Sequence, residues 1–283
     1  MKKKKVGIIG AGIMGTGVAQ CFAQKGYSVI LIDLSEEILE KAKENIFRNI
    51  RFQTLFNKDI EPEDPEIVIA QIRFTTDYEL LGDVDFVIEN VPEIWEIKKE
   101  VYHKIDSICP EHCIFLANTS CISITKIGSL TKRPAKVVGV HFMNPVPLKK
   151  TVETIKGYHT SEETIKTVEE LLRDISKECI IVNDLPGFVS NRLSHLLMNE
   201  AAFVVQDQVA TAEDVDNIFK KCFDHKMGPL ETADLIGLDT VVNSLDILYQ
   251  SYQDPKFRCC PLLRKMVDAG LLGRKSGQGF YKY

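Results

Sequence analysis

A histidine and a glutamate in the middle of the chain have the side chains that proton transfer requires. His141 follows the apolar run 136–140, which has the composition of a buried strand, and Glu153 lies in the next β-like segment, 151–155. Histidine exchanges protons near neutral pH, so a histidine at the end of a strand is a candidate general base. If the connection between the two segments folds back, Glu153 accepts the second imidazole N–H, which fixes the tautomer and stabilises the imidazolium. We therefore predict a catalytic His141–Glu153 pair; the alternative is that each residue is a packed or surface side chain.

Three glycines near the N-terminus have the spacing of a dinucleotide-binding turn. Gly10, Gly12 and Gly15 form a G-x-G-x-x-G sequence after the apolar run 6–9 and before a helical pattern. Glycines at these places allow a tight turn, close approach of a pyrophosphate to the backbone, and close packing of helix on strand. Asp33 stands 18 residues after the last glycine, where a carboxylate accepts hydrogen bonds from both ribose hydroxyls and repels a 2′-phosphate. The motif therefore predicts NAD rather than NADP as the cofactor.

A polar segment follows another predicted buried strand. It begins at Asn118 and continues through Ser120, Cys121 and Ser123. Asn118 and Ser120 have side chains that donate and accept hydrogen bonds, and we expect both near the nicotinamide. The alternative for the hydroxyl groups is helix capping, which is the role expected of Ser123. Nothing nearby in the sequence activates Cys121, so we do not expect this thiol to act as a nucleophile.

The elements expected around these residues alternate between strands and helices. Short runs rich in β-branched residues and amphipathic stretches follow one another through the first half of the chain. This pattern predicts a Rossmann-type, parallel, doubly wound α/β sheet, and such sheets bind ligands at the carboxyl ends of their strands. The predicted strands are 6–9, 28–32, 72–75, 85–88, 114–117 and 136–140, and the predicted helices are 18–25, one from Ser35 into the fifties, and 93–108. The polar stretch 57–65 is expected to be a loop.

The composition of the chain changes at residues 185–187, Leu-Pro-Gly. Beyond them come helical patterns with little β character, at 188–208, 212–223, 238–252 and 262–269. We therefore predict an NAD-binding Rossmann domain at 1–184 and an all-α C-terminal domain at 185–283. Asn191 and Arg192 fall near the start of the first of these helices, where both are expected to face a cleft.

Length, charge and cysteine usage limit the classes of function. The 283 residues carry a net charge of −5 and are 45% hydrophobic, which is typical of a globular protein and argues against a general nucleic-acid binder. No run of 18 apolar residues occurs, so no membrane span is expected. The apolar stretch 6–18 contains five glycines and precedes no clear cleavage site, so we do not expect a signal peptide. The eight cysteines form no C-x-x-C pair, which predicts reduced thiols in a cytoplasmic protein and no metal site.

Further blocks of sequence resemble one family along essentially the whole chain. Together with the glycine turn and the His141 segment, these blocks resemble the L-3-hydroxyacyl-CoA dehydrogenases, in particular the bacterial 3-hydroxybutyryl-CoA dehydrogenases. The blocks occur in the same order as in that family and at compatible spacings. These blocks are Glu89-Asn-Val-Pro-Glu93, Met227-Gly-Pro-Leu-Glu231, Gly237-Leu-Asp239 and the ending 273–281. The resemblance implies an NAD-dependent enzyme that interconverts a 3-hydroxyacyl and a 3-oxoacyl thioester. It also implies a homodimer formed through the helical C-terminal domain.

The resemblance assigns roles to individual residues. The family's catalytic histidine and its paired glutamate fall on His141 and Glu153. The serine that contacts the substrate hydroxyl falls on Ser120, and the asparagine that helps to hold the reacting oxygen falls on Asn191. The family's second glutamate of an E-x-x-x-E stretch, near the nicotinamide, falls on Glu93. The cofactor-binding residues implied together are Gly10, Gly12, Ile13, Met14, Gly15, Asp33, Glu93, Lys98, Asn118 and Ser120.

Departures from the family pattern concern the carrier of the thioester. Many CoA-dependent relatives have a lysine-rich stretch in the helix after the second strand, whereas the segment 49–57 of this chain contains Arg51 but few lysines. Loss of cations there weakens the binding of CoA phosphates. At segments starting at Cys121, His141 and His225, this chain resembles a subgroup that oxidises hydroxymalonyl-type groups on an acyl carrier protein in polyketide and related pathways. Both carriers therefore stay open, and Lys149 or Lys150 is either the partner of an extra substrate carboxylate or a surface residue.

Two other classes of protein share the predicted layout. Dehydrogenases of free β-hydroxy acids use a lysine as the base, so the His141–Glu153 pair argues against them. A non-enzymatic protein of the same fold would bind NADH without turnover of any acyl thioester. The presence of His141, Glu153, Ser120 and Asn191 together argues against that reading.

Overall fold

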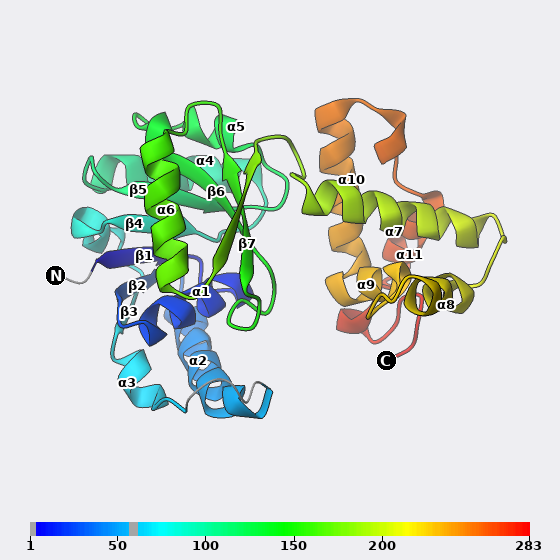
Figure 1. Cartoon of the computed structure of the whole chain (residues 1–283), viewed down its shortest axis with the longest axis horizontal. Helices are drawn as coiled ribbons and strands as arrows, with labels where there is room; N and C mark the ends of the chain where they lie inside the picture. Colours follow the sequence, from blue (N-terminus) through cyan, green and yellow to red (C-terminus); the bar gives the residue numbers. More distant parts are fainter. Residues whose placement is uncertain (1–3, 57–61) are drawn as a thin grey trace. The chain divides into compact units, whose positions relative to one another are not determined.

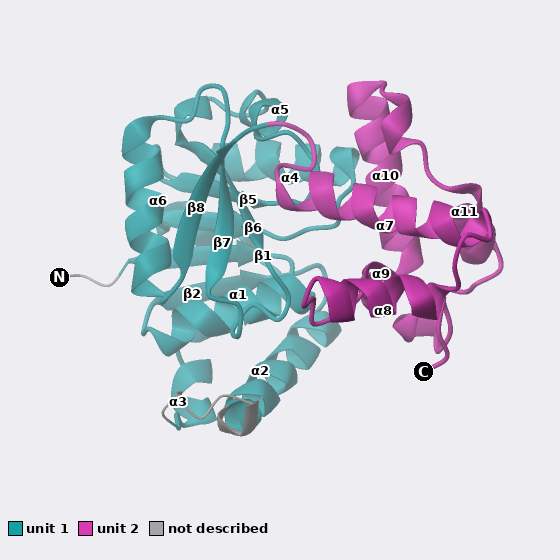
Figure 2. Ribbon diagram, turned by 45° about the vertical axis from the view of Figure 1, so that its right-hand side comes forward, with its two compact units in different colours: residues 1–184 teal, residues 185–283 magenta. Residues whose placement is uncertain are grey.

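The computed structural model describes residues 4–56 and 62–283, and the chain divides into two compact units. Unit 1 is Met1–Asp184 and unit 2 is Leu185–Tyr283 (Figure 2). Unit 1 contains a mixed sheet covered by helices, and unit 2 is helical, which confirms the predicted fold class. Within the described ranges, no helix is both long enough and apolar enough to cross a membrane.

The described strands of unit 1 form one eight-stranded sheet in the order β3-β2-β1-β4-β5-β6-β7-β8 (Figure 1). All pairs from β3 through to β6 are parallel. The chain order reverses at β1, which lies between β2 and β4, and a dinucleotide binds at the carboxyl ends of the strands beside such a reversal. The strands are β1 (Lys5–Ile9), β2 (Ser28–Ile32), β3 (Ile72–Thr75), β4 (Phe86–Glu89), β5 (Ile114–Asn118), β6 (Val137–Phe142), β7 (Thr151–Lys156) and β8 (Glu178–Asn183).

Helices cover both faces of this sheet. Apolar side chains of α1, α2 and α6 join those of the strands in one buried cluster, and in Figure 1 α6 crosses in front of the sheet while α4 lies behind it. Burial of this cluster is the main source of the stability of unit 1. The helices are α1 (Ile13–Gln24), α2 (Glu36–Phe56), α3 (Pro65–Ile69), α4 (Trp95–Ile108), α5 (Ile124–Gly128) and α6 (Glu162–Asp174), with 3-10 turns at Tyr78–Asp83 and Pro134–Lys136.

The strands predicted up to residue 140 form the parallel part of the sheet, and the direction changes at β7, where the connection after β6 folds back as expected. This strand pairs antiparallel with β6, and β8 pairs parallel with β7, so the last two strands run against the others. Only the eight residues 143–150 separate β6 from β7. A parallel crossover needs a dozen or more residues. A connection of this length therefore returns the chain antiparallel to the preceding strand.

Several elements differ from the sequence predictions. Helix α1 begins at Ile13, within the glycine motif, whereas the predicted helix began five residues later. α6 and β8 had no predicted counterpart, although the buried positions of α6 (Ile165, Val168, Leu171 and Leu172) have helical spacing. Ser123 caps α5 by accepting a hydrogen bond from the N–H of Lys126, as expected. Of the predicted loop 57–65, residues 57–61 lie outside the described residues.

Unit 2 packs its helices around a separate apolar core. Met198, Leu230 and Leu245 are among the buried side chains of this core. The C-terminal segment closes the unit because the N–H groups of Phe280 and Tyr281 donate to the carboxylate of Asp234. The helices are α7 (Ser190–Gln206), α8 (Ala212–Cys222), α9 (Pro229–Ile236), α10 (Leu238–Tyr252) and α11 (Pro261–Asp268), with 3-10 turns at Pro255–Phe257 and Arg274–Ser276. Of these helices, α9 had not been predicted.

Candidate active site

The antiparallel pairing of β6 and β7 places His141 directly opposite Glu153. Directly opposed residues of two antiparallel strands project to the same face of the sheet. Nδ1 of His141 lies 3.1 Å from Oε2 of Glu153, and the two residues are 7% and 8% exposed. A carboxylate only accepts hydrogen bonds, so Nδ1 carries a proton and its N–H donates a hydrogen bond to Glu153. The structure therefore brings together the two residues that the sequence suggested for proton transfer.

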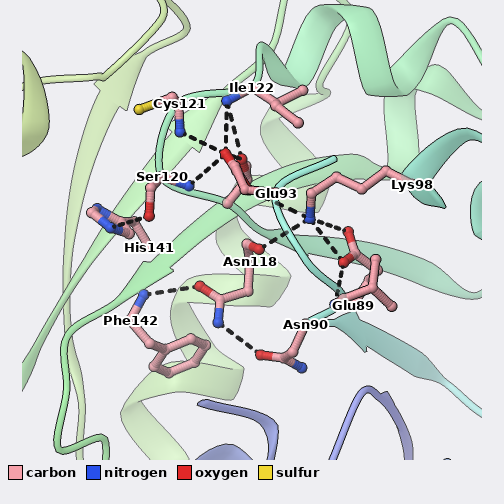
Figure 3. A network of polar contacts seen from close by, with 12 residues as sticks. Glu89, Asn90, Glu93, Lys98, Asn118, Ser120, Cys121, Ile122, His141 and Phe142 are labelled. Carbon is pink, nitrogen blue, oxygen red and sulfur yellow. Dashed lines mark hydrogen bonds and ion pairs between the residues drawn. The ribbon is translucent and has the colours of Figure 1, made fainter. Parts of the chain in front are cut away.

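Ser120 adds a hydroxyl group on the other side of the imidazole. Its Oγ lies 3.2 Å from Nε2 of His141, and it stands in the loop after β5, the strand next to β6 (Figure 3). With Nδ1 protonated toward Glu153, Nε2 is the nitrogen that exchanges a proton. The three residues thus form a chain of hydrogen bonds in which a hydroxyl group meets the basic nitrogen of a histidine held by a carboxylate.

A buried ion pair lies beneath the loop that carries Ser120. Nζ of Lys98 lies 2.8 Å from Oε1 of Glu89, and both side chains are almost entirely buried (Figure 3). Burial raises the pKa of Glu89, while the Lys98 charge and the N–H of Val91 oppose that rise. Lys98 also donates to the backbone oxygen of Asn118, at the end of β5. The pair therefore joins β4, α4 and β5 at the carboxyl edge of the sheet.

Asn118 uses its side chain within the same edge. Its amide nitrogen donates to Oδ1 of Asn90 at 2.7 Å, and its Oδ1 accepts from the N–H of Phe142 at 3.3 Å. These bonds hold the ends of β4, β5 and β6 together next to His141. Asn90 had not been singled out from the sequence, although it stands in the Glu89-Asn-Val-Pro-Glu93 block.

The glycine turn between β1 and α1 has room for a dinucleotide. Gly10 has a φ of +90°, and a Cβ on Gly15 would lie 1.7 Å from the backbone oxygen of Gly10. A Cβ on Gly12 would meet nothing within 4 Å, so the backbone is open on that side. Asp33 Oδ2 accepts from the N–H of Ala11 at 2.6 Å, which places its carboxylate beside the turn. These features fit a pyrophosphate on the turn and a ribose at Asp33.

Two cavities are lined by residues of α2 and of the connection between β6 and β7. The first, of about 560 Å³, is lined by the residues of the turn, by Lys41, Arg48 and Asn49 of α2, and by Asn144–Pro147. We call it the turn cavity. The second, also about 560 Å³, is mostly apolar and is lined by Gln20, Arg48, Asn49, Phe52, Gln53, Pro145, Pro147 and Leu148. We call it the α2 cavity.

The connection between β6 and β7 forms a wall of both cavities. Nζ of the buried Lys177 donates to the backbone oxygens of Val146 and Lys149, each at 2.6 Å. Burial lowers the pKa of Lys177. The side chain of Lys177 therefore holds the backbone of the connection in place. The side chains of Lys149 and Lys150 are exposed.

Asn191 and Arg192 stand in the first turn of α7, in unit 2. The backbone oxygen of Asn191 lies 3.0 Å from Nδ1 of His195, one turn further along the helix. The guanidinium of Arg192 lies over the ring of Tyr252, 4.8 Å from its centroid. Arg192 is thus in contact with another part of unit 2.

Family profiles match nearly the whole chain. The profile described as 3-hydroxyacyl-CoA dehydrogenase, NAD binding domain, matches residues 5–185. The profile described as 3-hydroxyacyl-CoA dehydrogenase, C-terminal domain, matches residues 187–283. The chain belongs to the 3-hydroxyacyl-CoA dehydrogenase family. The resemblance inferred from the sequence blocks is confirmed, and so is NAD as the cofactor of the family's first domain.

Individual members of the family are similar over their full length. A probable 3-hydroxybutyryl-CoA dehydrogenase of Deinococcus radiodurans is 45% identical over 279 residues, which cover 99% of this chain and 100% of the relative. A 3-hydroxybutyryl-CoA dehydrogenase of Clostridioides difficile is 42% identical, covering 99% of each. The crystal structure of (S)-3-hydroxybutyryl-CoA dehydrogenase from Ralstonia eutropha superposes with a TM-score of 0.93 at 39% identity, covering 100% of this chain and 99% of that one.

Proposed function

We propose that this chain catalyses the NAD-dependent interconversion of 3-hydroxyacyl-CoA and 3-oxoacyl-CoA, with 3-hydroxybutyryl-CoA as its substrate. The observation that carries the proposal is the hydrogen-bonded chain Ser120–His141–Glu153 at the carboxyl edge of an NAD-binding sheet. The family membership and the names of the similar proteins support the same substrate class.

The chemistry follows from the positions of the protons. In oxidation, Nε2 of His141 removes the proton of the 3-hydroxyl group while C3 loses a hydride. The acceptor of that hydride would be supplied by NAD held on the turn Gly10–Gly15 and at Asp33. Glu153 stabilises the imidazolium that forms, and the Ser120 hydroxyl orients the reacting oxygen toward Nε2. In reduction the imidazolium returns the proton to the oxygen of the 3-oxo group.

The remaining site residues have proposed roles that the resemblance supplies. The turn Gly10–Gly15, including Ile13 and Met14, holds the pyrophosphate, and Asp33 binds the ribose hydroxyls. The part of the cofactor site next to the nicotinamide is formed by Glu93, Lys98, Asn118 and Ser120. Asn191, in unit 2, has the role of holding the reacting oxygen.

CoA is the proposed carrier of the acyl group. Arg48 lines both the turn cavity and the α2 cavity and provides a guanidinium for a phosphate. An acyl carrier protein, as in the hydroxymalonyl-type dehydrogenases of polyketide pathways, is the second candidate, supported by the sequence segments named above.

The test is oxidation of NADH with acetoacetyl-CoA, followed at 340 nm. We expect turnover with kcat of about 1–10³ s⁻¹, the usual range for enzymes. The control is the same assay with acetoacetate, which lacks the thioester and should support no turnover. Tight NADH binding without turnover of acetoacetyl-CoA, but with turnover of an acyl-carrier-protein thioester, would replace CoA by the carrier protein.

We also propose a homodimer through unit 2. Leu193 and Leu197 are 63% and 38% exposed on α7, and residues four apart lie on one face of a helix. These two leucines are the apolar side chains of α7 that we propose the partner chain covers. Sedimentation equilibrium should give twice the 32.0 kDa chain mass, and Leu193→Glu with Leu197→Glu should give the monomer mass. The control, Val209→Glu in the turn after α7, should leave the dimer intact, and a monomeric wild type would contradict the proposal.

A further inference from the structure

Glu93 lies between β4 and α4 and faces the loop that carries Ser120 (Figure 3). One oxygen of its carboxylate, Oε1, accepts from the hydroxyl of Thr119 and from three successive backbone N–H groups. The N–H distances are 3.1 Å for Ser120, 2.9 Å for Cys121 and 3.1 Å for Ile122. A single carboxylate oxygen therefore collects four donors from four consecutive residues.

Successive N–H groups that converge on one point form an anion-binding concavity. A bound anion is usually a ligand, but here it is the protein's own Glu93. Hydrogen bonds to a charged acceptor are about twice as strong as neutral ones. The second oxygen of Glu93 lies 3.8 Å from Nζ of Lys98, so the carboxylate is placed between a cation and the loop.

The residue held in this way is the one that contacts the histidine. Ser120 donates its N–H to Glu93, and its Oγ lies 3.2 Å from Nε2 of His141. Without the carboxylate of Glu93, the N–H groups of Ser120, Cys121 and Ile122 would lose the charged acceptor that they share. The loop would then relax, and the hydroxyl of Ser120 would leave its place beside the imidazole.

We propose that Glu93 is a positioning residue that acts through Ser120: its carboxylate organises the loop 119–122 so that the hydroxyl group meets His141. This inference rests on the proposed function and goes beyond the role near the nicotinamide that the resemblance implies. A residue that acted only on the cofactor would affect NADH binding and would act independently of Ser120.

A double-mutant cycle separates the two roles. Glu93→Ala is expected to lower kcat with acetoacetyl-CoA by up to about 10²-fold, the cost of a displacement of about 1 Å in an active site. With Ser120→Ala already present, Glu93→Ala should lower kcat no more than about twofold further, because residues that act in one chain are not additive. The dissociation constant of NADH is measured beside kcat, because a role confined to the cofactor would change that constant and leave kcat at saturating NADH unchanged.

The controls use neighbouring residues. Glu96→Ala removes an exposed carboxylate three residues further along and should leave kcat unchanged. Glu93→Gln keeps an acceptor oxygen and should lose less activity than Glu93→Ala. If Glu93→Ala does not fold, Thr119→Val removes the hydroxyl group that donates to Glu93 and accepts from the N–H of Ile122, and this variant should show the same dependence on Ser120. Three results would each overturn the proposal. They are effects that multiply in the double variant, a wild-type kcat in Glu93→Ala, and a loss confined to NADH binding.

A second measurement does not depend on turnover. In an NMR spectrum, Glu93→Ala should shift the ring signals of His141 in the same direction as Ser120→Ala does, because both variants remove the hydroxyl from Nε2. Unshifted ring signals in Glu93→Ala would contradict the positioning role. If the wild type showed no activity with any acyl thioester, the proposed function would fail while this measurement would still decide the role of Glu93.

Discussion

Replacement of His141 by alanine is expected to lower kcat for acetoacetyl-CoA reduction by about 10²–10⁴-fold, the usual contribution of a positioned acid/base. The variant loses the imidazole that contacts both Ser120 and Glu153. NADH binding should be unaffected, since His141 does not line the turn cavity. The measurement is steady-state kinetics together with NADH fluorescence titration.

The matched control for this variant is His159→Ala. His159 is an exposed histidine in the turn after β7, where it contacts the ring of Tyr158. Its replacement should change kcat less than twofold, because most substitutions of surface residues have little effect. More than a tenth of wild-type activity in His141→Ala, or a large rise in its NADH dissociation constant, would show that the acid/base assignment is wrong.

Replacement of Lys98 by methionine is expected to destabilise the protein by about 3–5 kcal/mol, the usual cost of leaving one member of a buried ion pair without its partner. Methionine fills a similar volume, so the loss measures the charge and its hydrogen bonds rather than a cavity. Glu89 would stay buried with the N–H of Val91 as its remaining donor among the bonds described above. Urea unfolding gives the change in the free energy of unfolding.

The pH dependence of the Lys98→Met variant has a definite sign. Burial already raises the pKa of Glu89, and loss of the Lys98 charge raises it further. A carboxyl group whose pKa is higher in the folded state binds more protons there than in the unfolded chain, so stability falls as pH rises through the folded pKa. The deficit of the variant should therefore shrink as the pH is lowered toward the pKa of an unfolded glutamate.

Lys99→Met is the control for that experiment. Lys99 is the next residue of α4 and is exposed, so its replacement should change the free energy of unfolding by less than about 0.5 kcal/mol. A deficit in Lys98→Met no larger than that of Lys99→Met would contradict the view that the ion pair joins β4, α4 and β5. A deficit that grows at low pH would contradict the direction of the Glu89 shift.

Local patterns predict the parts of this fold in which one segment decides its own structure. The strands at Ser28–Ile32 and Ile72–Thr75 have the predicted bounds, because each is a short run of strand-forming residues between breaks. α6 and β8 were missed although α6 has helical spacing, and β8 is an edge strand whose side chains are mostly exposed or half-buried. Its pattern therefore lacks the alternation that marks a strand with one buried face.

The site was predictable to the same extent. A histidine after a strand and a glutamate in the next segment suggested a pair, but the pairing itself depends on the length of the connection 143–150. The contact between Glu93 and the loop 119–122 joins segments that are 26 residues or more apart, and no local pattern encodes it. Long-range contacts of this kind are decided by the packing of the sheet edge.

The antiparallel pair of β6 and β7 divides the site into a part that reacts and a part that selects. His141 and Glu153 are held by backbone hydrogen bonds within the sheet, whereas Pro145, Pro147 and Leu148 of the connection line the cavities. Substitutions in the connection can therefore reshape the ligand-facing surface while the proton-transfer geometry stays as the strands define it. A one-residue insertion inside β7 would instead turn Glu153 to the opposite face of the sheet. Changes in ligand binding in this scaffold are thus expected to arise through the connection, with the two strands unchanged.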